Sequence, residues 1–261
     1  MRTLKLLALG GFFIACATPA VHAQTTPAGE TSRFFFNVNL GAQWNDQTFT
    51  DSSTYTIYGE QGAVATAHSI GGGTLFDISG AARVWRNAAI GIAYSSVSNK
   101  NDATSVVRVP HPVIFGQTRT ATATVSDLKH SEDAVHLQFM WLIPLTNKIE
   151  IAVMVGPSFF SVKQSVATVR APEDLTDVPP YTTVTINTMT VTDVKDSPVG
   201  VNIGIDGTYM IRTIAGVGVG VGGFLRYAGA SLDLDVPPGV TRDTELNAGG
   251  PQGALGVRLR F

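Results

Sequence analysis

The sequence predicts an all-β fold, an eight-stranded antiparallel transmembrane up-and-down β-barrel, from three observations. Apolar and polar residues alternate through eight segments, and the connections between these segments are alternately short and long. The chain also closes on an alternating strand, in which Leu255, Val257, Leu259 and Phe261 share one face. Alternation with a period of two gives a strand one apolar and one polar surface.

The alternating segments match the length of a strand that crosses a bilayer at a tilt. Ten residues that rise about 3.3 Å each and tilt near 40° cover roughly 25 Å, the height of the apolar band of a membrane barrel. The segments run over about 33–44, 73–85, 90–95, 133–142, 149–155, 199–211, 215–221 and 252–261. Aromatic residues near their ends would form the expected girdles: Phe34, Trp44, Tyr94, Trp141, Tyr209, Tyr227 and Phe261.

The connections predict which ends of the strands share a side of the membrane. Tight turns are expected at Arg86-Asn87, Thr146-Asn147 and Arg212-Thr213. The long connections are 45–72, 99–132, 165–197 and 233–247. Within them, 106–124 and 181–192 are rich in β-forming residues, so we expect them to extend the hairpins above the membrane. The pair Gly222-Gly223 is expected to mark a bulge or kink.

The first residues are typical of a cleaved secretory signal. Arg2 and Lys5 precede an apolar stretch, and Val21-His22-Ala23 offers small residues for a signal peptidase. The stretch is too short for a membrane-spanning helix, which needs about 20 residues. We therefore expect a signal peptide at 1–23, a linker at 24–32 and the barrel at 33–261. Cys16 lies within the signal, and a lipoprotein with Cys16 acylated is the alternative.

Composition excludes several classes of protein. Beyond the signal no run of 18 apolar residues occurs, which argues against helical membrane spans. Removing the signal leaves 16 basic and 20 acidic residues, a net charge of about −4 with no basic concentration suited to nucleic acid. A soluble β-sandwich is the alternative all-β fold, but its loops would be more even in length.

The chain resembles the small eight-stranded outer-membrane barrel proteins, the group of the OmpA membrane domain, OmpX and OmpW, from Arg33 to Phe261. Gly256, Leu259 and Phe261 match the terminal signal that the barrel-assembly machinery of bacteria reads, whereas Ala254 stands where a polar residue is usual. The resemblance implies a monomer in the bacterial outer membrane, short periplasmic turns and long extracellular loops, with outer-membrane lipid and lipopolysaccharide as partners. No periplasmic peptidoglycan-binding domain is expected after Phe261.

The polar faces of the strands would line the interior of such a barrel. Eight strands enclose a space just wide enough to be filled by side chains, so acids and bases there should pair with one another. The residues expected inside or at the rims are Asp77, Arg83, His136, Gln138, Glu150, Asn202, Asp206, Arg226, Arg258 and Arg260. A polar conduit or proton path, a catalytic site, and a narrow cavity beside the glycines of 215–221 are the alternatives.

No motif points to a metal, a cofactor or a catalytic centre. His68, His111 and His130 fall in expected loops, and none forms a His-x-His or His-Glu-x-x-His pattern. The run 130–132 contains the residue types of an esterase, but adjacent residues do not make a triad. Gly71-Gly72-Gly73 opens a strand, so it is expected to be a hinge and not a phosphate cradle.

The expected function is therefore non-enzymatic: envelope integrity, or surface interaction through the extracellular loops. One alternative is an OmpW-like channel for small hydrophobic molecules, and another is a lipid-modifying enzyme. Three of the loops, 45–72, 165–197 and 233–247, are acidic, which suits surface solvation or cation-bridged contact with lipopolysaccharide.

Overall fold

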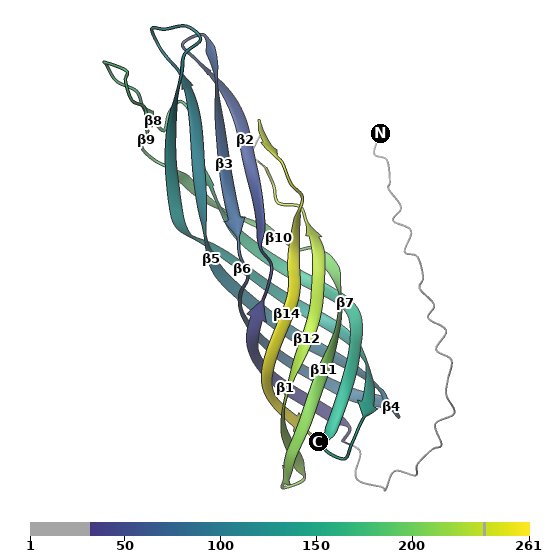
Figure 1. The fold of residues 1–261 in the computed structure, drawn as a ribbon. Coiled ribbons are helices and arrows are strands. Elements are labelled where there is room, and N and C mark those ends of the chain that lie inside the picture. Colours follow the sequence, from purple (N-terminus) through teal and green to yellow (C-terminus); the bar gives the residue numbers. More distant parts are fainter. Residues whose placement is uncertain (1–31, 237–238) are drawn as a thin grey trace, which may run out of the picture. The chain divides into compact units, whose positions relative to one another are not determined.

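The computed structural model describes residues 32–236 and 239–261, all of whose regular elements are strands (Figure 1). The predicted signal and nearly all of the linker lie outside these residues. Within them, no helix is long and apolar enough to cross a bilayer. The strands are β1 (Phe34–Gln43), β2 (Gln47–Ile57), β3 (Glu60–Ile70), β4 (Gly73–Trp85), β5 (Ala88–Pro110), β6 (Thr118–Pro144), β7 (Ile149–Thr168), β8 (Leu175–Thr176), β9 (Thr185–Ile186), β10 (Thr190–Asp196), β11 (Val199–Ile214), β12 (Val217–Leu232), β13 (Val240–Arg242) and β14 (Leu246–Arg260).

Eight of these strands close into an antiparallel ring in the order β1, β4, β5, β6, β7, β11, β12, β14. The ring is closed by the pairing of its first strand, β1, with its last strand, β14. This pairing runs from Phe35↔Arg260 to Gln43↔Gln252. Closure leaves the ring without a free edge, which a β-structure in lipid requires because no water is there to bond its backbone. The predicted fold class is confirmed, and the sandwich alternative is wrong.

The short turns differ from the prediction at one place. β4 and β5 meet at Arg86-Asn87, and 145–148 joins β6 to β7, as expected. β11, however, continues to Ile214, and the chain turns at Ala215 and Gly216, whose φ angles of 51° and 83° suit a two-residue hairpin. The turn predicted at Arg212-Thr213 is therefore wrong, because a register shift between Met210 and Arg212 absorbs one residue and lets the pairing go on.

The bulge expected at Gly222-Gly223 is also wrong. These residues pair in unbroken register with β11 and with β14. The absence of side chains at these two glycines therefore changes the surface of the barrel wall and leaves the strand pairing intact.

The long connections build a β-structure beyond the ring, as Figure 1 shows. β2 and β3 form a hairpin from 47 to 70, and β3 pairs with the outer part of β5. β5 and β6 stay paired as far as Pro110↔Thr118, so 99–132 is mostly strand and not the predicted loop. The extension expected for 106–124 is confirmed, while 181–192 contains only β9 and the start of β10.

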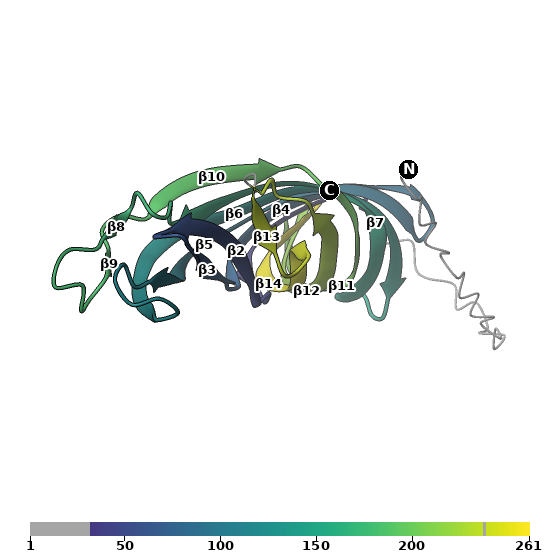
Figure 2. The ribbon, with the colours of Figure 1, turned by 90° about the horizontal axis from the view of Figure 1, so that it is seen from above.

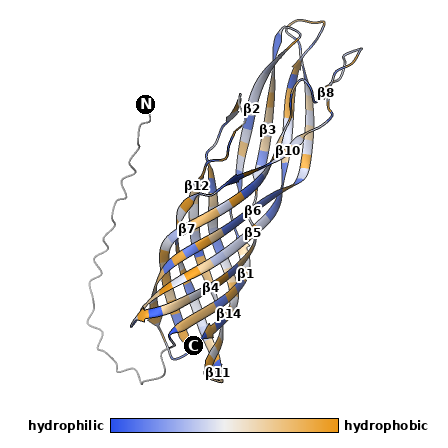
Figure 3. Cartoon of the chain, turned by 180° about the vertical axis from the view of Figure 1, so that it is seen from behind, coloured by the Kyte–Doolittle hydropathy of each residue, from blue (hydrophilic) through white to orange (hydrophobic). Residues whose placement is uncertain are grey.

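The ring has apolar side chains outside and polar ones inside, the reverse of a soluble protein. Exposed apolar residues cover its outer face. Figure 3 shows hydrophobic residues distributed along the strands of the ring. Each aromatic residue expected in the girdles is exposed, from Tyr94 at 41% to Phe34 at 59%. An apolar belt of this extent needs an apolar surrounding, because water contact would be costly. The barrel therefore fits a bilayer.

The extension beyond the ring has its own apolar core. Val64, Val107, Val109 and Val169 are buried there, with Tyr55 and Leu175 packed against them. On the outward faces of β2 and β3 stand small and polar residues such as Thr48, Thr54 and Ser69. This part thus fits an aqueous surrounding, with a core that holds it rigid.

Candidate functional site

The strands bring the predicted interior residues together inside the ring. Asp77, His136, Asp206, Arg226 and Arg258 are buried, and Arg258 has no exposed surface. Arg83 and Glu150 stand at the end with the short turns and are partly exposed. Gln138 and Asn202 are buried as well.

Arg258 and Asp206 form an ion pair across the interior. The Nη2 atom of Arg258 lies 2.7 Å from Oδ2 of Asp206, and its Nη1 atom donates to Asn39. Asp206 also accepts a hydrogen bond from Thr208 at 3.1 Å, and Thr208 in turn accepts one from Arg260 at 3.0 Å. These bonds tie β14 to β11 and β1 through side chains.

Arg260 carries the network to the rim with the short turns. It donates to Oδ1 of Asn37 at 2.8 Å and lies 3.9 Å from Glu150. Glu150 pairs with Arg83 at 3.2 Å. Both guanidinium groups lie over the ring of Phe35, at 4.5 Å for Arg260 and 5.5 Å for Arg83. A cation over an aromatic face is attracted by the ring electrons, which helps to hold these arginines in place.

Asp77 continues the network in the middle of the barrel. It accepts hydrogen bonds from Asn39 at 2.9 Å and from Nη2 of Arg226 at 3.0 Å. The Nε atom of Arg226 donates to Gln252 at 2.8 Å. Because Asn39 also accepts from Arg258, the two ion pairs belong to one chain of bonds.

The network ends at Gln164, on the side of the extension. Gln252 donates to Gln43 at 2.6 Å, and Gln43 donates to Glu132 at 2.8 Å. The carboxylate of Glu132 is hydrogen-bonded to Nε2 of His130 at 3.0 Å. The Nδ1 atom of His130 lies 2.6 Å from Oε1 of Gln164. Side-chain contacts thus run without a break from this residue to Arg83 at the opposite rim.

The interior is electrically balanced and filled. Four arginines and four acids lie there: Arg83, Arg226, Arg258 and Arg260, with Asp77, Glu132, Glu150 and Asp206. Of the acids, Glu132 contacts His130 and Gln43 and not an arginine. The void between Asp77, Asp206 and Arg226 measures about 10 Å³. That is the space of about one water molecule, too small for a hydrated ion to pass. Side chains therefore fill the interior at this level.

The run 130–132, which contains the residue types of an esterase, does not assemble a catalytic triad. His130 and Glu132 meet, but Ser131 lies between them on the strand and points to the other face of the sheet. His136 bonds Ser95 at 2.8 Å and Ser158 at 2.7 Å, and Asn202 donates to Ser158. No group of three or more His, Cys, Asp or Glu residues that could hold a metal occurs among the described residues.

Sequence reasoning missed Glu132 and the amides that link the ion pairs. Glu132 was assigned to a loop because β6 was expected to begin at 133. It has the same parity as His136, which would have placed it inside had the strand been extended. Asn39 and Gln43 lie on the predicted polar face of β1, but one sequence does not reveal which charges their amides bridge.

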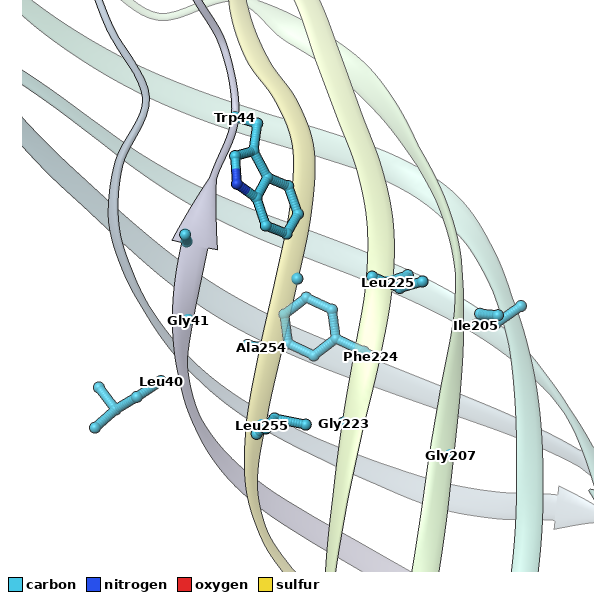
Figure 4. Close-up of a pocket in the computed structure, with 12 residues that line it drawn as sticks. Leu40, Gly41, Trp44, Ile205, Gly207, Gly223, Phe224, Leu225, Ala254 and Leu255 are labelled. Carbon is cyan, nitrogen blue, oxygen red and sulfur yellow. The ribbon is translucent and has the colours of Figure 1, made fainter.

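The outer wall carries an open apolar groove of about 680 Å³ (Figure 4). Gly207, Gly223 and Gly253 leave its floor bare, and Trp44 and Leu225 stand at its sides. Gly207 pairs with Gly223 in the sheet, so the missing side chains are neighbours. The groove opens in the lipid-facing belt and not among the outer loops.

A clasp of polar groups ties the parts of the extension together. Arg119 forms an ion pair with Asp177 and donates to the carbonyl oxygens of Pro110, at 2.9 Å, and Tyr181, at 3.1 Å. The hydroxyl of Tyr58 donates to Asp177 at 3.2 Å. Hydrogen bonding from Arg119 lowers the pKa of Asp177, so this carboxylate stays charged and keeps its partners. Burial raises the pKa of Tyr55, beside the clasp, to about 12.

His68 of β3 is buried in the extension without a hydrogen-bond partner for either ring nitrogen. Its ring stacks on Phe49, with 4.5 Å between centroids, and Arg242 lies 4.6 Å from the centroid of Phe49. Arg242 is held by Asp51 at 2.8 Å. Burial lowers the pKa of His68 to about 4, with Arg242 adding to the shift and Asp51 opposing it.

We predict that Arg258→Ala lowers the stability of the barrel by about 3–5 kcal/mol, because it leaves Asp206 buried without its counter-charge. The matched control is Lys100→Ala, which breaks the exposed pair with Asp127 and should change stability by less than about 1 kcal/mol. Thermal unfolding, followed by the change in gel mobility of the folded barrel, compares the two. Equal midpoints would contradict a structural role for the ion pair.

We predict that acid loosens the β2–β3 hairpin through His68. Because its pKa is about 4 when folded and near 6.5 when unfolded, the unfolded hairpin takes up a proton first as the pH falls. Stability is then lost between about pH 6.5 and 4, to a total on the order of 3 kcal/mol, and is unaffected by this group above pH 6.5. Amide-exchange protection of 47–70 should fall over that range, and His68→Phe should remove the fall. An unchanged pH dependence in the variant would show that other groups cause it.

No protein-family model matches the chain, and no curated protein matches its sequence. It is similar in fold to the outer membrane protein OprG from Pseudomonas aeruginosa, at 10% identity over 88% of this chain and 96% of that chain, with a TM-score of 0.46. Neisserial surface protein A is 10% identical over 87% and 97%, with a TM-score of 0.41. The outer membrane protease OmpT from Escherichia coli is 11% identical over 89% and 99%, with a TM-score of 0.37.

Proposed function

We propose that this protein is a non-enzymatic outer-membrane β-barrel that displays a rigid extension at the cell surface for contact with other molecules. The observation that carries the proposal is the contrast between the two ends of the barrel. One end has turns of a few residues, while the other continues into paired strands with a core and a clasp of their own. Long projecting strands suit recognition at a distance from the membrane.

The filled interior supports a structural role for the ring in preference to transport. An uptake channel for small hydrophobic molecules would need a continuous apolar path from the outer loops, whereas the bonded chain from Gln164 to Arg83 occupies the interior. The apolar groove of Figure 4 lies on the outside of the wall. A lipid chain is the occupant that its position favours.

Lipid and lipopolysaccharide are the proposed partners of the belt and of the surface just above it. The acidic stretches 45–72 and 233–247 meet there, since β13 pairs with β2. Carboxylates at this level suit divalent cations shared with lipopolysaccharide phosphates. We further propose that the protein acts as a monomer, because its ring closes on itself and leaves no strand to donate.

Cell fractionation tests the proposal. The protein should be recovered with the outer membrane and migrate differently on gels before and after boiling. Protease added to intact cells should cut within the extension, for instance near Arg170, which is exposed and lies outside the strands. Planar-bilayer recordings should show no large, stable conductance. Recovery from the soluble periplasm, or a porin-like current, would refute the proposal.

We predict that Phe261→Ala reduces the amount of protein in the outer membrane several-fold, because the assembly machinery is proposed to read the terminal aromatic. Main-chain bonds of residue 261 to Arg33 and Phe34 would remain in this variant. Val257→Ala is the matched control, since Val257 lies on the same face and is 49% exposed against 50% for Phe261. A lipid-facing side chain alone contributes about 1.5–3 kcal/mol, too little to prevent folding of a closed barrel. Similar levels of both variants would mean that Phe261 is not a signal.

A further inference from the structure

We propose that the far tip of the β5–β6 hairpin, residues 111–117, inserts into a zwitterionic lipid bilayer other than the one that holds the barrel. This inference deepens the proposed surface role and rests on it. The tip exposes three consecutive apolar side chains: Val113 is 74% exposed, Ile114 53% and Phe115 87%. Exposed apolar side chains in such a cluster mark a contact site, because each loses free energy in water that burial would recover.

The backbone of the tip is already bonded in a way that suits an apolar surrounding. The Nδ1 atom of His111 accepts the N–H groups of Val113 and Ile114, both at 3.1 Å. Glu60, from the β2–β3 hairpin, accepts the N–H of Gly116 at 3.1 and 3.2 Å. Two further bonds join main-chain groups: the N–H of His111 donates to the carbonyl oxygen of Gln117 at 2.8 Å, and the N–H of Gln117 donates to that of Ile114 at 3.3 Å. Five of the six N–H groups of the tip are therefore bonded within the protein, and the N–H of Phe115 is the one not included.

This bonding distinguishes lipid from a protein partner. Hydrocarbon offers no hydrogen-bond partners, so a segment that enters it must satisfy its backbone internally. A protein pocket could supply acceptors of its own, so the bonding within the tip favours lipid over a protein partner. Gly116 adopts a φ of 77°, where a side chain would be strained, and this bend presents Phe115 outward.

The charge at this end of the extension argues against an anionic surface. The ranges that form it, 55–64, 106–121 and 170–187, hold three arginines and four acids. One of the arginines, Arg119, is neutralised by Asp177. Anionic lipids, nucleic acid and sulfated sugars attract basic clusters, which these ranges lack. A neutral, zwitterionic bilayer surface is left as the fitting partner.

The length of the hairpin places the tip out of reach of the barrel's own membrane. The outward side chains of β5 become polar from Ser96 onward, which marks the edge of the apolar belt. From Val97 to Pro110 the strand is roughly 45 Å long at about 3.3 Å per residue, which is roughly 35 Å of height at a tilt near 40°. The clasp at Arg119 and the pairing of β3 with β5 hold the hairpin at that height. A facing membrane is therefore the lipid surface that the tip can meet.

Binding of the full chain, reconstituted in lipid nanodiscs, to phosphatidylcholine vesicles tests this inference. The wild-type protein should sediment with the vesicles, and V113S/I114S/F115S should bind at least tenfold more weakly. Val178→Ser, which removes an apolar side chain that is 61% exposed at the same end of the extension but outside the tip, is the control and should bind as the wild type does. Phosphatidylglycerol vesicles should give no tighter binding.

A second pair of variants tests the prepared backbone. Glu60→Ala removes the acceptor of the Gly116 N–H and should weaken vesicle binding, whereas Glu60→Gln keeps an acceptor oxygen and should bind like the wild type. Equal binding by the tip-serine variant, stronger binding to anionic vesicles, or no binding by the wild type would each overturn the inference. Heat-modifiable migration of the nanodisc sample is checked first. If it is lacking, the barrel proposal fails; if it is present without vesicle binding, only the tip inference fails.

Discussion

Closure of the sheet between β1 and β14 is the constraint on which the rest of the structure depends. A strand edge left open in lipid would carry backbone groups that nothing can bond. Closing eight strands makes a narrow cylinder whose inner face must be filled by side chains. Because the outer face has to be apolar, the alternating residues of every strand send the polar side chains inward. The ion pairs of the interior follow from that geometry.

The interior satisfies its charges by connecting them. A buried ion pair is costly to desolvate, and the cost is recovered when the remaining donors and acceptors also find partners. Asn39 does this by bonding both Asp77 and Arg258, and Gln252 does it by joining Arg226 to Gln43. The amides thereby turn separate pairs into one network along the barrel. Loss of one member would be felt by its neighbours as well.

The sequence was sufficient for the ring and for every arginine and acid of its interior except Glu132, because a period of two reports directly which side a residue faces. The sequence was less informative about strand limits, turn positions and side-chain partners, because pairing between strands determines these. β5 runs past residue 95 and β6 begins before residue 133, because these two strands pair with each other and β5 also pairs with β3. The turn at Ala215-Gly216 depends on a bulge in the pairing of β11 with β12. The partners of Arg258 depend on barrel shear, which no single strand encodes.

One rule, that a backbone in an apolar surrounding must bond itself, links the ring to the far tip of the extension. In the ring the rule is met by neighbouring strands. Between the end of β5 at Pro110 and the start of β6 at Thr118 no neighbouring strand pairs with the tip. The Nδ1 atom of His111 and the carboxylate of Glu60 act as acceptors there instead. Acceptors within the protein lower the cost of desolvating these N–H groups when the tip leaves water, as the proposed insertion requires. The two ends of the hairpin are thus built for the same kind of surrounding, with an aqueous span between them.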